Sequence, residues 1–247
     1  MMPGIILASG YGSLRRCGYP KTLEPVGDKP MLARIVETAI SAGVTDLVVV
    51  VNPHSGDKIR GALAGYHGLR FAVQPDRRGA ADAIMHGINA LPASRDCVVL
   101  YGDMPLWRSD TVWRLMHSHL RHGAALSLAP APLDRALAPE LDRYGRVLRD
   151  CRGRVCAVVD PRDVTSSEVN PSLWAFDTNW FCRKLGAIPA VPRGDMHPPE
   201  RSPQPLVELA HNQGSLIGET AVYDPREALG VNSAEELERI RKIASST

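Results

Sequence analysis

The sequence predicts an α/β protein built around a doubly wound, mainly parallel sheet. Two observations lead to this prediction. Runs of apolar and β-branched residues alternate with longer segments of helical pattern, and these runs are continuously apolar. Continuous apolar strands are typical of a parallel sheet covered by helices on both faces. The alternation of strands and helices is also the chain order that such a sheet requires.

Strand–helix pairs account for the first half of the chain. Strands are expected over residues 4–8, 46–51, 70–73 and 97–101, and helices over residues 31–42, 56–64, 80–91 and 110–122. Ligands of doubly wound sheets bind beyond the carboxyl ends of the strands. The sequence therefore predicts a site in the segments that directly follow these strands.

The second half of the chain is expected to be richer in β-structure. Residues 145–149 and 154–159 have the pattern of two strands joined by a tight turn. Residues 189–205 contain six prolines, which argue against a regular element and predict a long loop. Ser233 and Glu236 form a capping-box pattern that predicts a terminal helix.

Composition limits the classes of function. The 29 basic and 27 acidic residues give a formal net charge of +2 without the basic run that would indicate a nucleic-acid partner. The apolar runs are too short to cross a membrane, and the five cysteines form no CxxC pair. We expect one cytoplasmic domain, residues 1–247, made of two halves, 1–143 and 144–247. The sequence does not decide between a monomer and a homo-oligomer.

The histidines on the predicted helix 110–122 are His117, His119 and His122. Two residues that lie two positions apart on a helix face different ways. We therefore interpret these side chains as solvated helix surface rather than as a metal site.

The first turn after a strand, residues 7–16, contains Gly10 and Gly12, whose backbone N–H groups can point at a phosphate chain. Lys21, which follows a proline, could then neutralise the phosphates. The turn has neither the Walker pattern nor the dinucleotide GxGxxG pattern. A tight strand-to-helix turn without a ligand is the alternative interpretation.

Asp103 follows an apolar strand at the ligand-binding edge of the sheet, and its carboxylate is a hard oxygen ligand suited to Mg²⁺. Asn232 offers a second, neutral oxygen before the terminal helix. The alternatives are a turn-forming aspartate and a helix-capping asparagine. Nucleotidyl transfer needs a metal and cations that absorb phosphate charge, which Lys21, Arg15 and Asp103 would supply.

Ordered motifs extend this pattern over nearly the whole chain. They are ILASGYG (6–12), PK (20–21), GDKPML (27–32), QP (74–75), GAADA (79–83), YGDMPL (101–106), YGRV (144–147), EVN (168–170) and GVN (230–232). With them the chain resembles the sugar-phosphate nucleotidyltransferase family, and within it is most similar to the uridylyltransferase domain that makes UDP-N-acetylglucosamine.

The resemblance implies a Rossmann-like, glycosyltransferase-A-like fold in which residues 1–143 form the nucleotide-binding half and residues 144–247 the sugar-binding half. It also implies a set of residue roles. Catalysis falls to Lys21, Arg15 and Asp103, with Mg²⁺ held by Asp103 and Asn232. The nucleotide is bound by Leu7, Ala8, Ser9, Gly10, Gly12, Gln74, Gly79, Ala80 and Gly102, and the sugar by Gly145, Asp160 and Asn170. The implied reaction joins a nucleoside triphosphate, UTP above all, to N-acetylglucosamine 1-phosphate or glucose 1-phosphate and releases pyrophosphate.

The chain also departs from the family pattern. Leu14 stands where the phosphate-binding arginine is expected, so that Arg15 comes one position late, and Pro171 replaces the threonine of an NTG motif. These departures leave two alternatives. One is a cytidylyl- or guanylyltransferase for another small phosphate, and the other is a catalytically weakened protein that binds a nucleotide or nucleotide sugar. The sequence shows no β-helix repeat, so a fused acetyltransferase is not expected.

Overall fold

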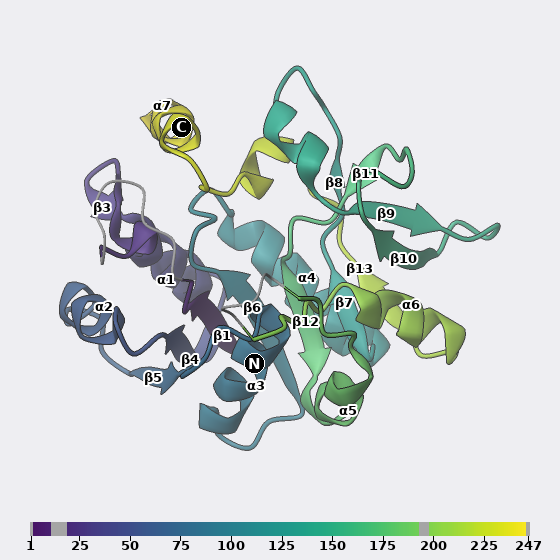
Figure 1. Ribbon diagram of the computed structural model, residues 1–247, viewed down its shortest axis with the longest axis horizontal. Helices are drawn as coiled ribbons and strands as arrows, with labels where there is room; N and C mark the ends of the chain where they lie inside the picture. The colour runs from purple at the N-terminus through teal and green to yellow at the C-terminus, as the bar shows by residue number, and fades with distance from the viewer. Residues whose placement is uncertain (1, 11–18, 193–197, 246–247) are drawn as a thin grey trace.

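The computed structural model describes residues 2–10, 19–192 and 198–245. Its largest sheet has seven strands in the order β13-β7-β12-β6-β1-β4-β5 (Figure 1). These strands are β1 (Met2–Ala8), β4 (Val44–Val51), β5 (Leu69–Val73), β6 (Asp96–Tyr101), β7 (Leu126–Leu128), β12 (Trp174–Asp177) and β13 (Ile217–Glu219). The pairs β1–β4, β1–β6, β4–β5 and β13–β7 are parallel, whereas β12 is antiparallel to both of its neighbours. The predicted mainly parallel sheet is confirmed.

Helices cover both faces of this sheet, as the doubly wound prediction requires. They are α1 (Met31–Ser41), α2 (Gly56–Ala62), α3 (Ala80–Ala90), α4 (Ser109–His122), α5 (Thr178–Lys184), α6 (Pro205–Asn212) and α7 (Ala234–Ser245). On β1, Ile6 packs into the cluster that contains α1, α4 and α7, whereas Ile5 packs into the cluster with α3, α5 and α6. Successive residues of a strand point to opposite faces, which divides the core in this way.

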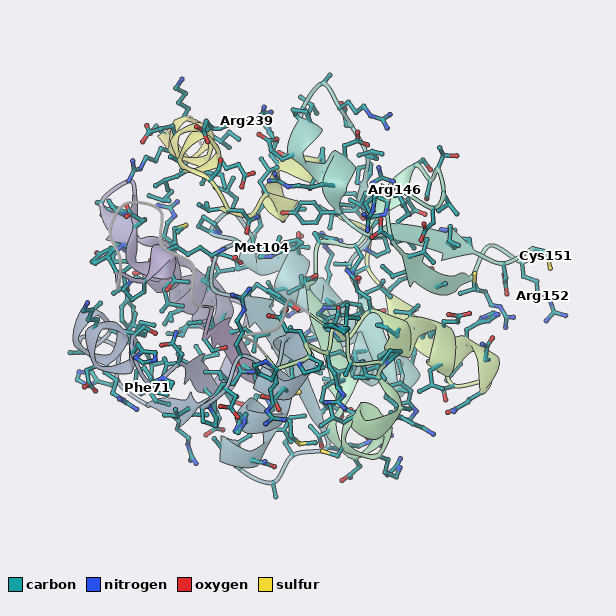
Figure 2. All side chains as sticks on the ribbon, viewed as in Figure 1. Phe71, Met104, Arg146, Cys151, Arg152 and Arg239 are labelled. Carbon is teal, nitrogen blue, oxygen red and sulfur yellow. The ribbon has the colours of Figure 1, made fainter. Side chains whose placement is uncertain are left out.

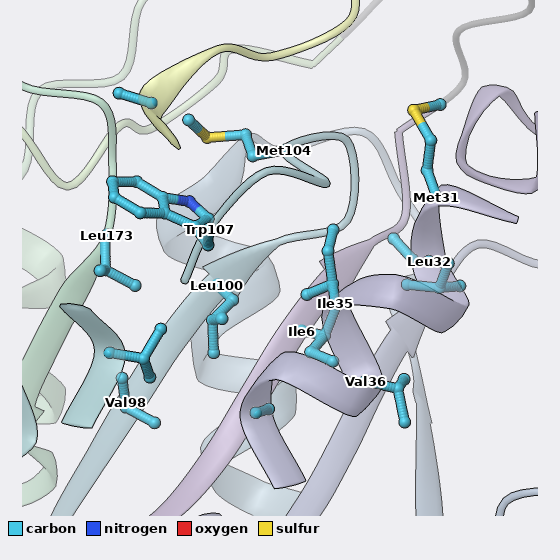
Figure 3. Packing of buried hydrophobic residues seen from close by; sticks show 14 of the residues in the cluster. Ile6, Met31, Leu32, Ile35, Val36, Val98, Leu100, Met104, Trp107 and Leu173 are labelled. Carbon is cyan, nitrogen blue, oxygen red and sulfur yellow. The ribbon is translucent and has the colours of Figure 1, made fainter. Parts of the chain in front are cut away.

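Figure 3 shows the first of these two clusters from close by. Ile6 and Leu100 project from adjacent strands toward Ile35 of α1. None of these three residues is more than 1% exposed. Trp107 and Met104 close the cluster where the chain leaves β6. Full burial of a large aliphatic side chain stabilises a fold by about 1.5–3 kcal/mol. The loop that carries Asp103 is therefore anchored in the hydrophobic core through Met104 and Trp107.

A smaller sheet of four strands, in the order β10-β9-β11-β8, lies beside the large one (Figure 1, right). Its strands are β8 (Ala131–Pro132), β9 (Arg146–Arg149), β10 (Val155–Val159) and β11 (Glu168–Val169). The antiparallel β9–β10 pair confirms the predicted hairpin. Cys151 and Arg152 lie at its exposed tip (Figure 2), where Gly153 has a φ of +76°.

The remaining short elements are the β2–β3 pair (Pro25–Val26 with Lys29–Pro30) and the 3-10 helices η1 (Lys21–Leu23), η2 (Pro139–Arg143), η3 (Leu185–Ala187) and η4 (Pro225–Ala228). The predicted terminal helix is α7, and Ser233 Oγ accepts the Glu236 N–H at 3.2 Å, as the capping pattern requires. Glu236 in turn accepts the N–H of Asn232 at 2.6 Å.

The proline-rich segment is only partly a loop. Val191 and Glu200 form an antiparallel β-bridge, and α6 begins at Pro205. Proline is preorganised for the first turn of a helix, where its missing N–H costs no hydrogen bond, so the end of a proline-rich segment can open one. Across the described ranges, no helix combines the length and the hydropathy needed to cross a bilayer.

The interpretation of the three histidines as solvated surface is wrong for His119. This side chain is 0% exposed, and its two ring nitrogens lie 2.8 Å from Ser127 Oγ and 3.2 Å from Asp96 Oδ1. His117 and His122 are exposed as expected. A histidine can be buried when polar partners satisfy both ring nitrogens, and both partners here come from the sheet.

Candidate functional site

A pocket of about 390 Å³ lies where β1, β5 and β6 end. It is lined by Leu7, Ala8, Ser9, Gly10, Lys21, Thr22, Gln74, Arg77, Gly79, Ala80, Ala83, Tyr101, Asp103, Glu200 and Asn232. These residues come from segments far apart in the sequence, and four of them lie within two residues after the end of a strand, namely Ser9, Gly10, Gln74 and Asp103. The carboxyl edge of the sheet, where a site is expected, thus carries a cavity of ligand size.

Lys21 lies at the centre of the polar side of this pocket. Its Nζ is 2.6 Å from Asp103 Oδ2 and 3.1 Å from Asn232 Oδ1, and it donates to the Val231 carbonyl at 2.8 Å. The side chains of Lys21 and Asp103 are only 15% and 23% exposed. The ammonium group therefore occupies a cradle of three oxygen atoms, one of them charged.

Backbone contacts hold the two sides of this cradle together. The Val231 N–H donates to the Asp103 carbonyl at 2.9 Å, and the Gly230 N–H donates to the Tyr144 hydroxyl at 3.0 Å. A Cβ at position 230 would lie 3.0 Å from that hydroxyl. Burial, with a smaller contribution from the Asp103 charge, raises the pKa of Tyr144 well above its ordinary value. Tyr144 therefore stays neutral and holds the backbone at Gly230, while the Val231–Asp103 hydrogen bond keeps the segment of Asn232 beside Asp103.

The opposite side of the pocket contains Gln74, which is 4% exposed. Its side chain is bonded to Ser9 Oγ, to the Gly79 carbonyl and to Asp82. Behind it, Asn52 Nδ2 donates to the Ser9 carbonyl at 3.1 Å and so fixes the chain where it leaves β1. The predicted nucleoside contacts Ser9 and Gln74 are thus parts of one buried network.

Gly79 has a φ of +88°, and a Cβ at this position would lie 2.5 Å from the Arg201 carbonyl oxygen. The neighbouring Ala81 N–H donates to that oxygen at 2.9 Å. Arg77 pairs with Glu200 across the same contact at 2.7 Å. The segment before α6 therefore packs directly against the turn that leads into α3, and it contributes Glu200 to the pocket wall.

Several lining residues escaped the sequence analysis. Thr22 has a buried Oγ1 without a hydrogen-bond partner among the described residues, and Arg77 and Tyr101 also line the pocket. Asn52 and Asp82 do not line the pocket, but they form hydrogen bonds to the lining residues Ser9 and Gln74, respectively. Asn52 directly follows a predicted strand, which is the one signal that could have identified it. Thr22 and Glu200 carry no such local signal.

The predicted sugar residues lie apart from this pocket. Asn170 donates its N–H to the Gly145 carbonyl at 2.8 Å, and the Ser172 N–H donates to Asn170 Oδ1 at 3.1 Å. Asn170 is 1% exposed, and its Nδ2 has no partner in the part of the chain that the structure describes. Ser172 adopts a φ of +65°, a conformation that costs energy for a residue with a side chain. Gly145 and Asn170 therefore form one unit with an unused donor.

Asp160 is not brought to the same place. It lines a different hollow of about 850 Å³ on the small sheet, together with Arg143, Arg146 and Arg162. Arg162 holds both of its carboxylate oxygens at 2.8 Å and thereby keeps the pKa of Asp160 far below its ordinary value. The sugar role of Asp160 stays a prediction that this geometry does not support.

Three further predicted residues remain to be placed. Gly102 donates its N–H to the Leu7 carbonyl at 2.8 Å, and a Cβ there would lie 2.9 Å from the same oxygen. Gly102 therefore joins β6 to β1 behind the pocket wall. Gly12 and Arg15 lie outside the described residues.

The donor set of the cradle fits a hard divalent cation. A carboxylate and an amide oxygen already converge on one positive charge, that of Lys21. Within the described ranges, no group of three or more His, Cys, Asp or Glu residues is arranged to hold a metal. Magnesium is often held by one or two protein ligands and completes its shell with phosphate oxygens and water. Asp103 and Asn232 match that mode of binding.

Comparisons with known proteins identify the family of this chain. Residues 4–144 match the family of MobA-like NTP transferase domains. The bifunctional protein GlmU of Ralstonia nicotianae (strain ATCC BAA-1114 / GMI1000) is 33% identical over 248 residues, which cover 97% of this chain and 51% of that protein. The chain thus spans about half the length of the curated relatives it matches.

Two solved structures share the fold over nearly their whole length. A putative glucose-1-phosphate thymidylyltransferase from Bacillus anthracis has a TM-score of 0.78 at 16% identity, covering 100% of this chain and 96% of its own. A CMP:2-keto-3-deoxy-manno-octonic acid synthetase complexed with CTP has a TM-score of 0.72 at 20% identity, covering 99% and 98%. The predicted glycosyltransferase-A-like fold is confirmed. Since the family match spans more than half of the sequence, the chain belongs to the family of MobA-like NTP transferase domains.

Proposed function

We propose that this protein is a Mg²⁺-dependent sugar 1-phosphate nucleotidyltransferase. It would transfer UMP from UTP to N-acetylglucosamine 1-phosphate or glucose 1-phosphate. The observation that carries the proposal is the convergence of Asp103, Asn232 and Val231 oxygens on the Lys21 ammonium at the edge of the pocket. The name of the Bacillus anthracis neighbour, a putative glucose-1-phosphate thymidylyltransferase, supports the same class of reaction.

Each residue of the cradle has a distinct role in this proposal. Asp103 and Asn232 would hold Mg²⁺, which neutralises charge on the triphosphate when it is bound. Lys21 binds the phosphates as a point charge and stabilises the negative charge that develops as the leaving group departs. Nucleotidyl transfer needs little covalent chemistry from the protein, so positioning and charge are the main contributions of this site.

The reaction is a displacement at the α-phosphorus of the nucleotide. An oxygen of the sugar phosphate forms a new bond to that phosphorus, and the bond between the α-phosphorus and the oxygen bridging to the β-phosphate breaks. Both electrons of the broken bond leave with pyrophosphate. The nucleoside would lie between the turn after β1 and Gln74, with the sugar phosphate toward residues 144–247. In that half of the chain, Asn170 Nδ2 is a donor without a hydrogen-bond partner among the described residues.

One observation favours the second candidate, a protein that binds a nucleotide or nucleotide sugar without efficient turnover. Arg162 holds the Asp160 carboxylate in a separate hollow, so the predicted sugar ligand is engaged elsewhere. The retained cradle around Lys21 argues for the enzyme, because a simple binding protein has no need to align a carboxylate, an amide and a lysine in this way.

A panel assay tests the proposal. Purified protein is incubated with Mg²⁺, each of the four ribonucleoside triphosphates or dTTP, and a series of sugar 1-phosphates that includes glucose and N-acetylglucosamine. The expected result is pyrophosphate release for UTP with one of these two sugars. Release with CTP or GTP and another phosphate would favour the related transferases. Nucleotide binding without release across the panel would favour the binding protein.

A further inference from the structure

Two hydrogen-bond acceptors converge on the side-chain nitrogen of Gln74. Its Nε2 donates to the Gly79 carbonyl at 3.0 Å and to Asp82 Oδ2 at 2.8 Å. A carbonyl and a carboxylate can only accept, so the atom that faces both must be the NH₂ group. Both hydrogens of that group are then in use.

The oxygen of the same amide has a donor of its own. Ser9 Oγ donates to Gln74 Oε1 at 2.5 Å. A carboxamide oxygen accepts two hydrogen bonds, which leaves one position on Oε1 for which no bond exists among the described residues. Because Gln74 lines the pocket, that acceptor position is the hydrogen-bonding capacity it can offer a ligand.

Asp82 fixes this orientation together with the Gly79 carbonyl, and it is the partner that carries a charge. A neutral partner such as an amide or hydroxyl could serve either end of Gln74, but a carboxylate facing Oε1 would be repelled by it. Asp82 is the third residue of α3, and α3 begins after Gly79 without a side-chain cap, so this carboxylate does not serve as the cap of the helix. Its nearest other partner is His86 Nε2, at a longer 3.6 Å.

A fixed acceptor discriminates among pyrimidine bases. Uracil and thymine carry an N–H donor at ring position 3, whereas the same position of cytosine is an acceptor. Two acceptors that face each other leave both without a partner, and sites built on a buried hydrogen bond reject such ligands strongly.

We propose that Asp82 is a positioning residue that, with Ser9 and the Gly79 carbonyl, locks the Gln74 amide so that only Oε1 faces the base. The site therefore selects uracil or thymine over cytosine. The proposal rests on the proposed function in one respect, namely that the base of the nucleotide lies against Gln74.

The test compares the binding of UTP and of CTP, by calorimetry and without a sugar phosphate, to the intact protein and to three variants. Asp82→Ala removes the carboxylate, and Asp82→Asn keeps its shape but can present either an oxygen or an NH₂ group. Asp76→Ala is the matched control, because Asp76 lies on the loop between Gln74 and Gly79, is half-exposed and pairs with Arg78 at 3.2 Å rather than with Gln74. Thermal unfolding of each variant checks that it folds.

The intact protein and Asp76→Ala should bind UTP at least about tenfold more tightly than CTP, since a mismatched buried hydrogen bond costs about that much. Asp82→Ala should reduce this ratio by severalfold, with Asp82→Asn in between. If Asp82 served only in folding, its replacement would weaken the binding of UTP and of CTP equally. An unchanged ratio in both Asp82 variants, or a preference of the intact protein for CTP, would overturn the proposal.

The result also separates this proposal from the proposed function. Selective UTP binding that depends on Asp82, without pyrophosphate release for any sugar 1-phosphate, would retain the positioning role and reject the enzyme. Pyrophosphate release from UTP, together with a UTP-to-CTP affinity ratio that the Asp82 variants leave unchanged, would retain the enzyme and reject the positioning role. If neither nucleotide binds, both proposals fail.

Discussion

At the scale of single residues, the central feature is a lysine that occupies the proposed cation site. The Lys21 ammonium lies 2.6 Å from Asp103 Oδ2 and 3.1 Å from Asn232 Oδ1, the two atoms proposed to hold Mg²⁺. Two cations cannot share these oxygens at such distances without strong repulsion. Lys21 must therefore give up these contacts when a metal binds, and it is then free to contact phosphate.

Replacement of Lys21 tests this exchange. In Lys21→Met the competing charge is gone, so Mn²⁺, used as a probe for Mg²⁺, should bind the nucleotide-free protein severalfold more tightly. The turnover proposed above should fall by about 100-fold or more in the same variant, because a charge that stabilises the transition state is lost. Free Mn²⁺ is measured by electron paramagnetic resonance.

Lys58→Met, which removes an exposed lysine of α2, is the control for the Lys21 experiment. It should leave both Mn²⁺ affinity and turnover as they are. Equal Mn²⁺ affinity of the intact protein and of Lys21→Met would contradict the exchange.

Residues with a local signal were the ones that the sequence could place. Lys21, Asp103 and Asn232 each stand in a short motif beside a predicted element, and they meet although up to 211 positions separate them. Asp160 and Glu200 show the limit of such reasoning. Asp160 pairs with Arg162, an interaction that no motif predicts. The position of Glu200 depends on how a long segment packs against the rest of the fold.

At the scale of elements, the long strands and helices of the first half were predictable and the short strands were not. β1, β4, β5 and β6 end at the predicted residues and begin one or two residues earlier than predicted, because each has a mainly apolar sequence that a polar residue or glycine follows. The three-residue strands β7 and β13 are too short for any periodicity to show. Pairing with neighbours in the sheet, rather than local sequence, makes them strands.

The turn before α3 gives a prediction at this scale. Gly79 has a φ of +88° and a ψ of 179°, a conformation that is essentially restricted to glycine. Gly79→Ala should lower the free energy of unfolding by about 1–3 kcal/mol from this strain, and the contact with Arg201 should add to the loss. Denaturant unfolding measures the change. Weaker nucleotide binding should accompany it, because the same turn lines the pocket.

Gly61→Ala is the matched control within α2. A Cβ at position 61 would meet no atom within 4 Å, so this substitution should be neutral or should stabilise by about 0.5–1 kcal/mol. Equal effects of the two substitutions would show that the close approach of Arg201 does not constrain the turn.

At the scale of the whole molecule, the two halves of the chain share one sheet. Strand β12 lies between β6 and β7 and is antiparallel to both, so a late segment is inserted beside an early one. His119 ties this region together, because α4 carries it, Asp96 of β6 binds one nitrogen and Ser127 of β7 the other. Such a strand order and such a bridge follow from tertiary packing, and no local pattern announces them.

This bridge makes stability depend on pH. Burial holds the pKa of His119 below its ordinary value of 6.5, although the Asp96 charge opposes the shift. A group whose folded pKa is depressed stabilises the fold fully above its unfolded pKa and loses that contribution as the pH falls below it. The protein should therefore unfold at lower urea concentration at pH 5.5 than at pH 7.5.

The variant His119→Asn isolates the contribution of this histidine. It should be less stable than the intact protein at pH 7.5, because the two buried partners lose a bond. Its urea midpoint should change less between pH 7.5 and 5.5, since the titrating group is absent. His117→Asn, at an exposed site, should retain the full pH dependence. An identical pH dependence in all three proteins would assign the acid sensitivity to other groups.

The central claim is that Lys21, together with Asp103 and Asn232 of its cradle, carries out nucleotidyl transfer. The most direct measurement follows the α-phosphate of labelled UTP in the presence of Mg²⁺ and N-acetylglucosamine 1-phosphate or glucose 1-phosphate, with the intact protein and with Asp103→Asn. The account predicts that the label enters a nucleotide sugar, with one pyrophosphate released per transfer, and that the isosteric variant is at least about 100-fold slower while remaining folded. Label that stays in UTP or appears only as UMP or UDP, or a variant as fast as the intact protein, would contradict it.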